Sequence, residues 1–353
     1  MSFALALSAH RGPRPLRLLP ALCLLAGVLL AAQFGAVSLT LDDWLAVLGR
    51  LGGAGDQSLR GAAHVLWQIR LPRAVFAVLV GAALGLAGAL CQGLFRNPLA
   101  DPGLLGVSSG AACAAALSIV VFTSFAGSLP APLRAWLLPA AAFAGALSVC
   151  FGLDRLARWL TPGSITGLLL TGIALNALAI AIVGLCTYLA NDEQLRSLSF
   201  WTLGSLAGAS WLLVGLFAAV LLFARWRLQR LLQAMNTLAM GEAVARQVGI
   251  DVSRIRSEVL VLVALLSGLA AAWCGMIAFV GLIAPQLVRV VCGPDQRRVL
   301  PLSMLCGGAL VLLADTLART LVIPAELPIG ILTALLGGPF FLILLRGARG
   351  RLA

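Results

Sequence analysis

Lysine is absent from the sequence, in which all 25 basic residues are arginine. The commonest phosphate-binding loop of nucleotide hydrolases, GxxxxGK(S/T), depends on a lysine that reaches the nucleotide phosphates. The chain therefore cannot be an ATPase of that type.

Histidine and acidic residues are also scarce. The only histidines are His10 and His64, and of the 13 acids only Asp315 lies well inside an apolar run. Without paired carboxylates or a histidine in an apolar run, no catalytic constellation is visible, so we expect the chain not to be an enzyme. Asp315 leaves two interpretations open: a proton relay in a proton-coupled secondary carrier, or a carboxylate that pairs locally or caps a helix.

The eight cysteines are isolated from one another, in or at the ends of apolar runs, and form no CxxC pair. This spacing indicates small packing residues, and neither a disulfide framework nor a metal site. We expect the chain to bind no metal and no cofactor of its own.

Charge is sparse overall. Only 11% of the residues are charged and 61% are hydrophobic, with a mean hydropathy of +1.03, whereas about 25% of an ordinary soluble domain is charged. The chain is therefore expected to be a polytopic membrane protein with the lipid bilayer as its surroundings. The formal charge of +12 does not indicate nucleic-acid binding, because the arginines flank apolar segments and do not form one patch.

The apolar runs predict an all-α fold with ten membrane-spanning helices in a single domain, residues 1–353. The run at 279–292 is short, since 14 residues of helix reach only about 21 Å, and Pro285 interrupts it, so at least one span is expected to be short or broken. The expected spans are 18–37, 66–91, 103–123, 136–153, 164–190, 209–224, 257–278, 279–292, 300–318 and 329–345.

An even number of spans places both termini on one side of the membrane. In this topology seventeen of the arginines lie on the side of the termini and seven on the other, with Arg289 inside a span. Because basic residues are in excess on the cytoplasmic side of membrane proteins, we expect both termini to be cytoplasmic.

The longest polar interruption, LAMGEAVARQVGI at 238–250, lies in the expected cytoplasmic connection 225–256. Met240, Val244 and Val248 recur every four residues and so fall on one face of a short helix, and Glu242 and Arg246 form a pair four residues apart on another. Gly241 is suited to begin this helix and Gly249 to end it. Periodicity alone leaves open whether the helix docks a partner or packs against its own chain.

Five motifs follow one another along the chain: RLPR at 70–73, GLFRNPLADPGLLG at 93–106, LAMGEAVARQVG at 238–249, FVGLIAPQLVR at 279–289 and ELPIGILTALLGGP at 326–339. Together they resemble the FecCD-like permease subunits of type II ABC importers, the group that imports iron-siderophores, haem and cobalamin. The resemblance covers nearly the whole chain.

The resemblance implies partners on both sides of a bacterial inner membrane. ATP and magnesium would be bound by a dimer of ABC ATPase subunits, a second copy of the permease would complete the pathway, and a periplasmic protein would deliver the substrate. It also implies residues for each contact. The expected ATPase-coupling residues are Leu238, Met240, Gly241, Glu242, Arg246 and Gly249.

At the opposite side, the resemblance implies that Arg70, Arg73 and Arg319 meet acidic residues of the periplasmic binding protein. Ordinary interfacial arginines are the alternative. A cytoplasmic gate is implied at Asn97, Leu99, Ile165 and Thr166. Gly337 and Gly338 are expected to allow close helix approach in the last span.

The sequence indicates the transported substrate less clearly than it indicates the family. The segment 195–211, LRSLSFWTLGSLAGASW, looks more like the haem permeases than the cobalamin branch. We therefore expect import of haem or a related iron complex from periplasm to cytoplasm, with an iron-siderophore or cobalamin permease as the alternative and a proton-coupled carrier as the alternative class.

Overall fold

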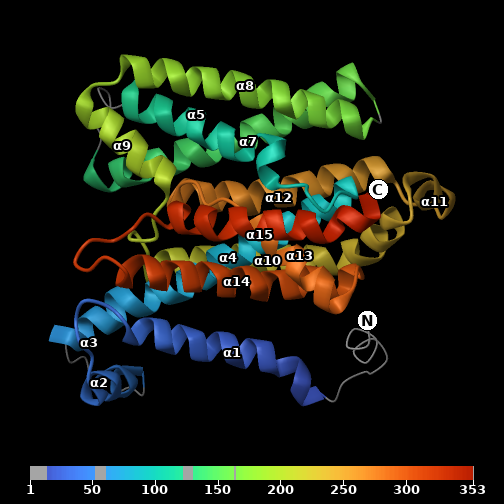
Figure 1. The fold of residues 1–353 in the computed structure, drawn as a ribbon. Helices are drawn as coiled ribbons and strands as arrows, with labels where there is room; N and C mark the ends of the chain where they lie inside the picture. Colours follow the sequence, from blue (N-terminus) through green and yellow to red (C-terminus); the bar gives the residue numbers. More distant parts are fainter. Residues whose placement is uncertain (1–13, 52–60, 122–129, 163, 353) are drawn as a thin grey trace.

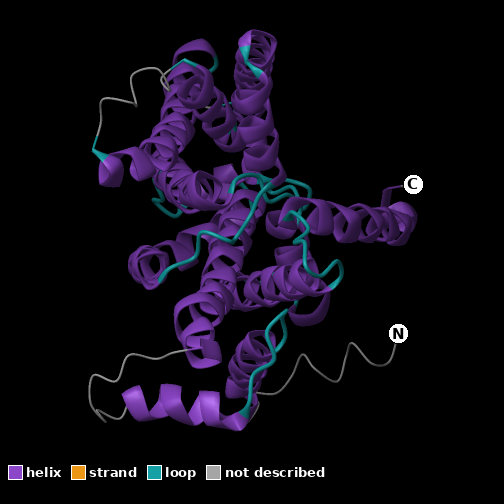
Figure 2. Cartoon of the chain, turned by 90° about the vertical axis from the view of Figure 1, so that its left-hand side faces the viewer, coloured by secondary structure: helices purple, strands orange, loops and turns teal. Residues whose placement is uncertain are grey.

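The computed structural model describes residues 14–51, 61–121, 130–162 and 164–352, and within them the chain is helical, with no strand. Figure 2 shows helices joined by loops throughout this part of the chain. Each of the ten expected spans corresponds to an apolar helix, which confirms the all-α polytopic fold. These helices are α1 (Arg14–Gln33), α4 (Leu71–Phe95, preceded by the π-helical turn η1, Leu66–Arg70), α5 (Val107–Val120), α7 (Ala131–Leu160), α8 (Ile165–Leu189), α10 (Trp211–Ala239), α12 (Val252–Cys274), α13 (Val280–Cys292), α14 (Gln296–Thr320) and α15 (Ile329–Leu352).

Shorter helices occupy the connections: α2 (Leu41–Leu51), α3 (Gly61–Val65), the 3-10 turn η2 (Pro102–Leu105), α9 (Asp192–Leu203) and α11 (Glu242–Gln247). Only α11 was expected from the sequence. Local capping explains two of the others. Thr40 donates its backbone N–H and its hydroxyl to Asp43 at the start of α2, and Asn191 and Gln194 form a capping box at the start of α9.

Helix α4 forms the centre of the bundle and packs against α10, α12, α13 and α14. Nearly all of its side chains are buried. Glycines make this packing possible because the backbones approach very closely. A Cβ atom on Gly88 would lie 1.7 Å from the carbonyl oxygen of Gly281, and one on Gly81 would lie 2.1 Å from that of Gly307.

The other helices are arranged around this centre (Figure 1). Helices α5, α7 and α8 pack on one another, and α12 contacts α7 from the central group. On the opposite edge α1 packs against α14 and α4. Figure 1 places the start of α1, the end of α15 and the short helix α11 at one end of the bundle, here called the α11 end. Helices α2, α3 and α9 lie at the other end, here called the arginine end.

Helix α13 is the short span that the sequence predicted. It begins at Val280, directly after Phe279, whose left-handed conformation (φ 65°) is not helical. The preceding helix α12 ends earlier, at Cys274, where Gly275 has φ 68°. Pro285 lies inside α13 without ending it. Gly337 of α15 approaches this break, since a Cβ there would lie 2.4 Å from Phe279 Cβ, whereas nothing lies within 4 Å of a Cβ on Gly338. The expectation of close approach is therefore right for Gly337 and wrong, within the described chain, for Gly338.

Candidate functional site

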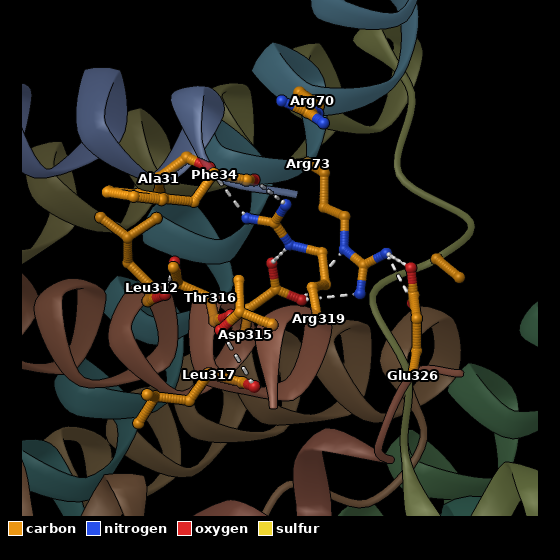
Figure 3. Close-up of polar contacts among 12 residues, drawn as sticks. Ala31, Phe34, Arg70, Arg73, Leu312, Asp315, Thr316, Leu317, Arg319 and Glu326 are labelled. Atoms are coloured by element: carbon orange, nitrogen blue, oxygen red, sulfur yellow. Dashed lines mark hydrogen bonds and ion pairs between the residues drawn. The ribbon is translucent and has the colours of Figure 1, made fainter. Parts of the chain in front are cut away.

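Two arginines cap the C-terminal end of α1 at the arginine end of the bundle. The last carbonyl groups of a helix have no partners within it and carry partial negative charge. Arg70 Nη1 donates to the carbonyl oxygens of Ala32 (3.2 Å) and Gln33 (2.9 Å). Arg319 donates through Nη2 to Ala31 (3.0 Å) and through Nη1 to Phe34 (3.1 Å), as Figure 3 shows for this second arginine.

The third arginine, Arg73, lies between two carboxylates (Figure 3). Its Nη2 is 2.9 Å from Asp315 Oδ1, and its Nη1 is 2.8 Å from Glu326 Oε2. Asp315 is completely buried, and its second oxygen accepts from Arg319 Nε at 3.1 Å. Of the alternatives for Asp315, local pairing is therefore confirmed.

The three arginines are only 5–8% exposed, so they are not the freely projecting side chains that the sequence suggested. They do line an open crevice of about 190 Å³ together with Gly35, Val37 and Glu326. Three guanidinium groups there face two carboxylates, which leaves a net positive charge. Gly35 is required at this point, because a Cβ on it would lie 2.7 Å from Arg70 Nη2. Chemically, the crevice is suited to accept a carboxylate.

Helix α11 is built as the sequence predicted. Gly241 precedes its first residue with φ 123°, and Gly249 follows with φ 82°. Glu242 pairs with Arg246 at 3.4 Å, but it also pairs with Arg256 of α12 at the shorter distance of 3.0 Å. Arg256 was not foreseen, and it holds Glu242 to the chain itself.

The exposed and buried residues of α11 separate its two surfaces. Ala245 is fully buried, as is Leu238 before the helix (2% exposed). Met240 and Val248 are 73% and 67% exposed. The helix therefore packs on its own chain through one side and presents apolar side chains outward on another. Packing on its own chain is therefore confirmed for one face, and docking of a partner by the exposed face stays a prediction.

The expected gate residues lie after α4 and at the start of α8. Asn97 Oδ1 accepts from the backbone N–H of Leu99 at 2.9 Å. Ile165 is the first residue of α8 and follows the N-cap Ser164, and the neighbouring Thr166 is exposed. Among the described residues no hydrogen bond joins the two pairs. The structure thus places all four on loops or helix ends.

The match to known proteins can now be set beside this geometry. The FecCD transport family model matches residues 23–347. The chain belongs to the FecCD transport family. It is thus the permease of a type II ABC importer and a multi-pass inner-membrane protein, and the members of this family are permease subunits, which are not enzymes themselves.

The FecCD relatives of this chain are named for two kinds of substrate. The chain is 47% identical over 284 residues to the hemin transport system permease protein of Yersinia pestis, covering 80% of this chain and 83% of that protein. It is 41% identical over 280 residues to the vitamin B12 import system permease protein of Pectobacterium atrosepticum, covering 79% and 82%. The corresponding Klebsiella pneumoniae protein is 37% identical over 330 residues, covering 94% and 93%.

A solved structure also has the FecCD chain's fold. It is described as an inward-facing conformation of a metal-chelate type ABC transporter. The TM-score is 0.79 at 32% identity, and the alignment covers 94% of this chain and 99% of the other.

Proposed function

We propose that this permease moves haem, or a related iron complex, from the periplasm to the cytoplasm. The observation that supports haem is the higher identity to the hemin permease, 47%, than to the vitamin B12 permeases, 37–41%. Cobalamin remains the second candidate because the vitamin B12 relatives align over up to 94% of the chain. The chain would work as two copies with an ABC ATPase dimer and a periplasmic binding protein.

In this proposal the arginine end faces the periplasm and Arg70, Arg73 and Arg319 receive the binding protein. What supports it is the crevice of about 190 Å³, in which the net positive charge and the half-exposed Glu326 are reachable from outside. An acidic side chain of the binding protein would enter there and compete with Glu326 for Arg73. The α11 end would then be cytoplasmic.

The α11 helix is proposed to couple the chain to the ATPase. Its exposed Met240 and Val248 supply an apolar contact, and Arg246, whose side chain is 64% exposed, supplies a charge at its edge. Asn97, Leu99, Ile165 and Thr166 are proposed to form the gate at this same end, where the loops after α4 and before α8 lie.

Uptake by reconstituted vesicles tests the cargo. With the cognate ATPase and binding protein, we expect ATP-dependent accumulation of haem, which falls to background when either protein or ATP is left out. An excess of haem should compete, and equal excesses of cobalamin or a ferric siderophore should not. Uptake without the ATPase would contradict the permease mechanism, and competition by cobalamin alone would assign the second candidate.

Filling the crevice tests the docking proposal without removing the structural arginines. Val37 lines the crevice and is 43% exposed, so Val37→Trp should weaken binding of the binding protein about tenfold, as for a central interface position. Val121→Trp, at an equally exposed position at the end of α5, serves as the control. Equal binding by both variants would refute docking at the crevice.

The coupling surface is tested by Met240→Asp and Val248→Asp. Each replaces an exposed apolar contact with a charge, and co-purification with the ATPase should fall about tenfold. Leu41→Asp, at an exposed position on α2 at the opposite end, should leave it unchanged. Normal assembly of both α11 variants would show that the helix does not dock the ATPase.

A further inference from the structure

A long apolar groove runs between α1, α13 and α14, away from the arginine crevice and from α11. Its volume is about 720 Å³, within the range of about 300–1,000 Å³ found for small-molecule sites. Its walls are almost entirely hydrocarbon, and include Leu24, Leu30, Leu287, Val291, Leu305 and Leu313. No function described above uses this groove.

The shape of the groove follows from how α1 is attached. Arg319 holds the C-terminal end of α1 to α14 through Ala31 and Phe34. Towards the α11 end, Figure 1 shows α1 diverging from α14, and there Pro20, Cys292 and Leu302 line the opening. The groove is therefore closed beneath the arginine end and open near the other surface of the bundle.

Arginines continue the two helix stripes that line the groove beyond its open end. On α14 the lining residues recur at spacings of three and four, which places them on one helix face. One turn before them on the same face stands Arg298; the residues of this stripe are Arg298, Leu302, Leu305, Ala309, Leu312 and Thr316. On α1 the stripe Pro20, Leu24, Gly27, Ala31 and Phe34 extends by the same spacing to position 17, which is arginine.

Arg298 is available to a ligand. Its side chain is exposed, and none of the ion pairs among the described residues includes it. The nearest acid in the chain, Asp295, interacts with Arg298 through its charge but forms no ion pair with it, and its carboxylate accepts hydrogen bonds from the backbone of Arg297 and from the side chain of Asn236. Arg297 is equally exposed but lies about 100° away around the helix, off the groove stripe. Arg297 is therefore a suitable control for Arg298, since both are exposed but only Arg298 continues the stripe that lines the groove.

We propose that the groove binds an anionic glycerophospholipid, with its acyl chains between α1 and α14 and its phosphate on Arg298. Apolar walls with a cation at the open end match a molecule with a hydrocarbon body and one negative end. A zwitterionic lipid brings its own cation to Arg298 and fits less well. A second copy of this chain would bring a second Arg298 of the same sign to the same place.

Native mass spectrometry of the delipidated full-length protein in detergent tests the charge. The probes are dioleoyl phosphatidylglycerol and dioleoyl phosphatidylcholine. The wild type should bind phosphatidylglycerol at a lipid concentration about tenfold lower than it needs to bind phosphatidylcholine, as expected for one charge-assisted hydrogen bond. Arg298→Gln should remove this preference, and Arg297→Gln should keep it. Equal binding of both lipids by the wild type, or equal losses in the two variants, would overturn the assignment.

A second pair of variants tests the groove itself. Ala309 is exposed and lines the groove, so Ala309→Trp should fill it and reduce binding of both lipids about tenfold. Ala181→Trp, on an exposed position of α8, should not, and gel filtration with thermal unfolding checks that both variants fold. Unchanged lipid binding by Ala309→Trp would overturn the proposal. A wild-type dimer that binds no lipid and dissociates in Ala309→Trp would do the same by assigning the groove to a second copy.

Discussion

At the scale of single residues, the guanidinium group of Arg319 joins a partner on its own helix to partners far away in the chain. It pairs with Asp315 four residues earlier and also reaches two carbonyl groups of α1, more than 280 positions away in the chain. The first contact follows from helix spacing. The others depend on how α1 docks, and no sequence pattern announces them. This is why the sequence placed the three arginines at one surface but missed their burial.

Replacing Asp315 with asparagine should strongly destabilise the protein. The substitution leaves the buried guanidinium groups of Arg73 and Arg319 without a compensating carboxylate, which costs about 3–5 kcal/mol when one partner of a buried pair is removed. Unfolding of the purified protein by dodecyl sulfate would measure this change.

Glu326→Gln is the matched control, since Glu326 shares Arg73 but is 47% exposed. Its loss should cost only about 0–1 kcal/mol. Similar costs for the two variants would show that burial does not govern this network. Uptake driven by an imposed pH gradient offers a second test of Asp315. If Asp315→Asn leaves that uptake unchanged, a proton-coupled carrier mechanism centred on this residue is excluded.

Asp295 gives a prediction about pH. Its carboxylate accepts from the backbone N–H of Arg297 and from the side chain of Asn236, and these contacts lower the pKa of Asp295 below 3.8. Because the folded-state pKa is lowered, the stabilisation is complete above the unfolded-state pKa of about 3.9 and is lost as pH falls through the folded-state value.

Asp295→Asn keeps an acceptor at the N-cap of α14 and removes the charge. At pH 7 the variant should be less stable by about 0.3–1 kcal/mol. The gap should begin to narrow as the pH falls towards the unfolded-state pKa of about 3.9 and should close only below the lower folded-state pKa of Asp295. Melting temperatures of the purified protein at a series of pH values measure it, and a gap independent of pH would contradict a role for the charge.

At the scale of elements, apolar runs were sufficient to locate ten apolar helices, of which six are long enough to cross a membrane within the described part of the chain. Hydropathy works well here because a helix in a bilayer must satisfy its own backbone. The same signal cannot find α2, α3 and α9, which lie in polar connections and depend on local caps. It also cannot fix where α13 begins, since that depends on the left-handed Phe279 and its contact with Gly337.

The glycines of α4 allow a prediction at this scale. Gly88→Ala would place a methyl group 1.7 Å from the Gly281 carbonyl oxygen, a clash between two backbones that no rotamer change relieves. The cost should be about 3 kcal/mol or more, at the upper end for overpacked cores, and little folded protein should be recovered by gel filtration.

The control is Gly215→Ala on α10, where nothing lies within 4 Å of the added carbon. There the change should be neutral or stabilise the helix by up to about 1 kcal/mol. Recovery of folded Gly88→Ala in wild-type amounts would mean that α4 and α13 do not approach as closely as described.

For α11, the residues predicted its bounds and left its partners open. Periodicity identified the exposed Met240 and Val248 and the pair of Glu242 with Arg246. It could not identify Ala245 as the packing contact or Arg256 as the second partner of Glu242, because both depend on where α12 lies relative to the loop. The sequence therefore predicted the exposed residues of this site, but not the contacts that hold α11 to the rest of the chain.

At the scale of the whole molecule, burial is distributed unevenly. Helix α4 is enclosed on all sides, whereas α8 exposes large apolar side chains along its length, including Leu170, Leu178 and Tyr188. In water such a surface would be exceptional. In a bilayer it is suited to lipid or, in the proposed pair of permeases, to a second copy.

Reporter fusions test the proposed orientation. A fluorescent protein joined after Arg351 or inserted after Gly249 should be active, because both positions are expected in the cytoplasm. Alkaline phosphatase joined after Ser205 or Ala325, at the arginine end, should be active only if that end is periplasmic. The reverse pattern of activities would invert the topology and with it the assignment of docking and coupling surfaces.

The capping of α1 by Arg70 and Arg319 links the position of this helix to the arginine crevice, which its own sequence does not suggest. The guanidinium groups proposed to receive an acidic side chain of the binding protein also hold the C-terminal end of α1. An acidic side chain that drew either arginine outward would leave carbonyl groups of α1 without their partners and would loosen the attachment of this helix. Binding at the arginine end would then change the width of the apolar groove between α1 and α14 at the opposite end.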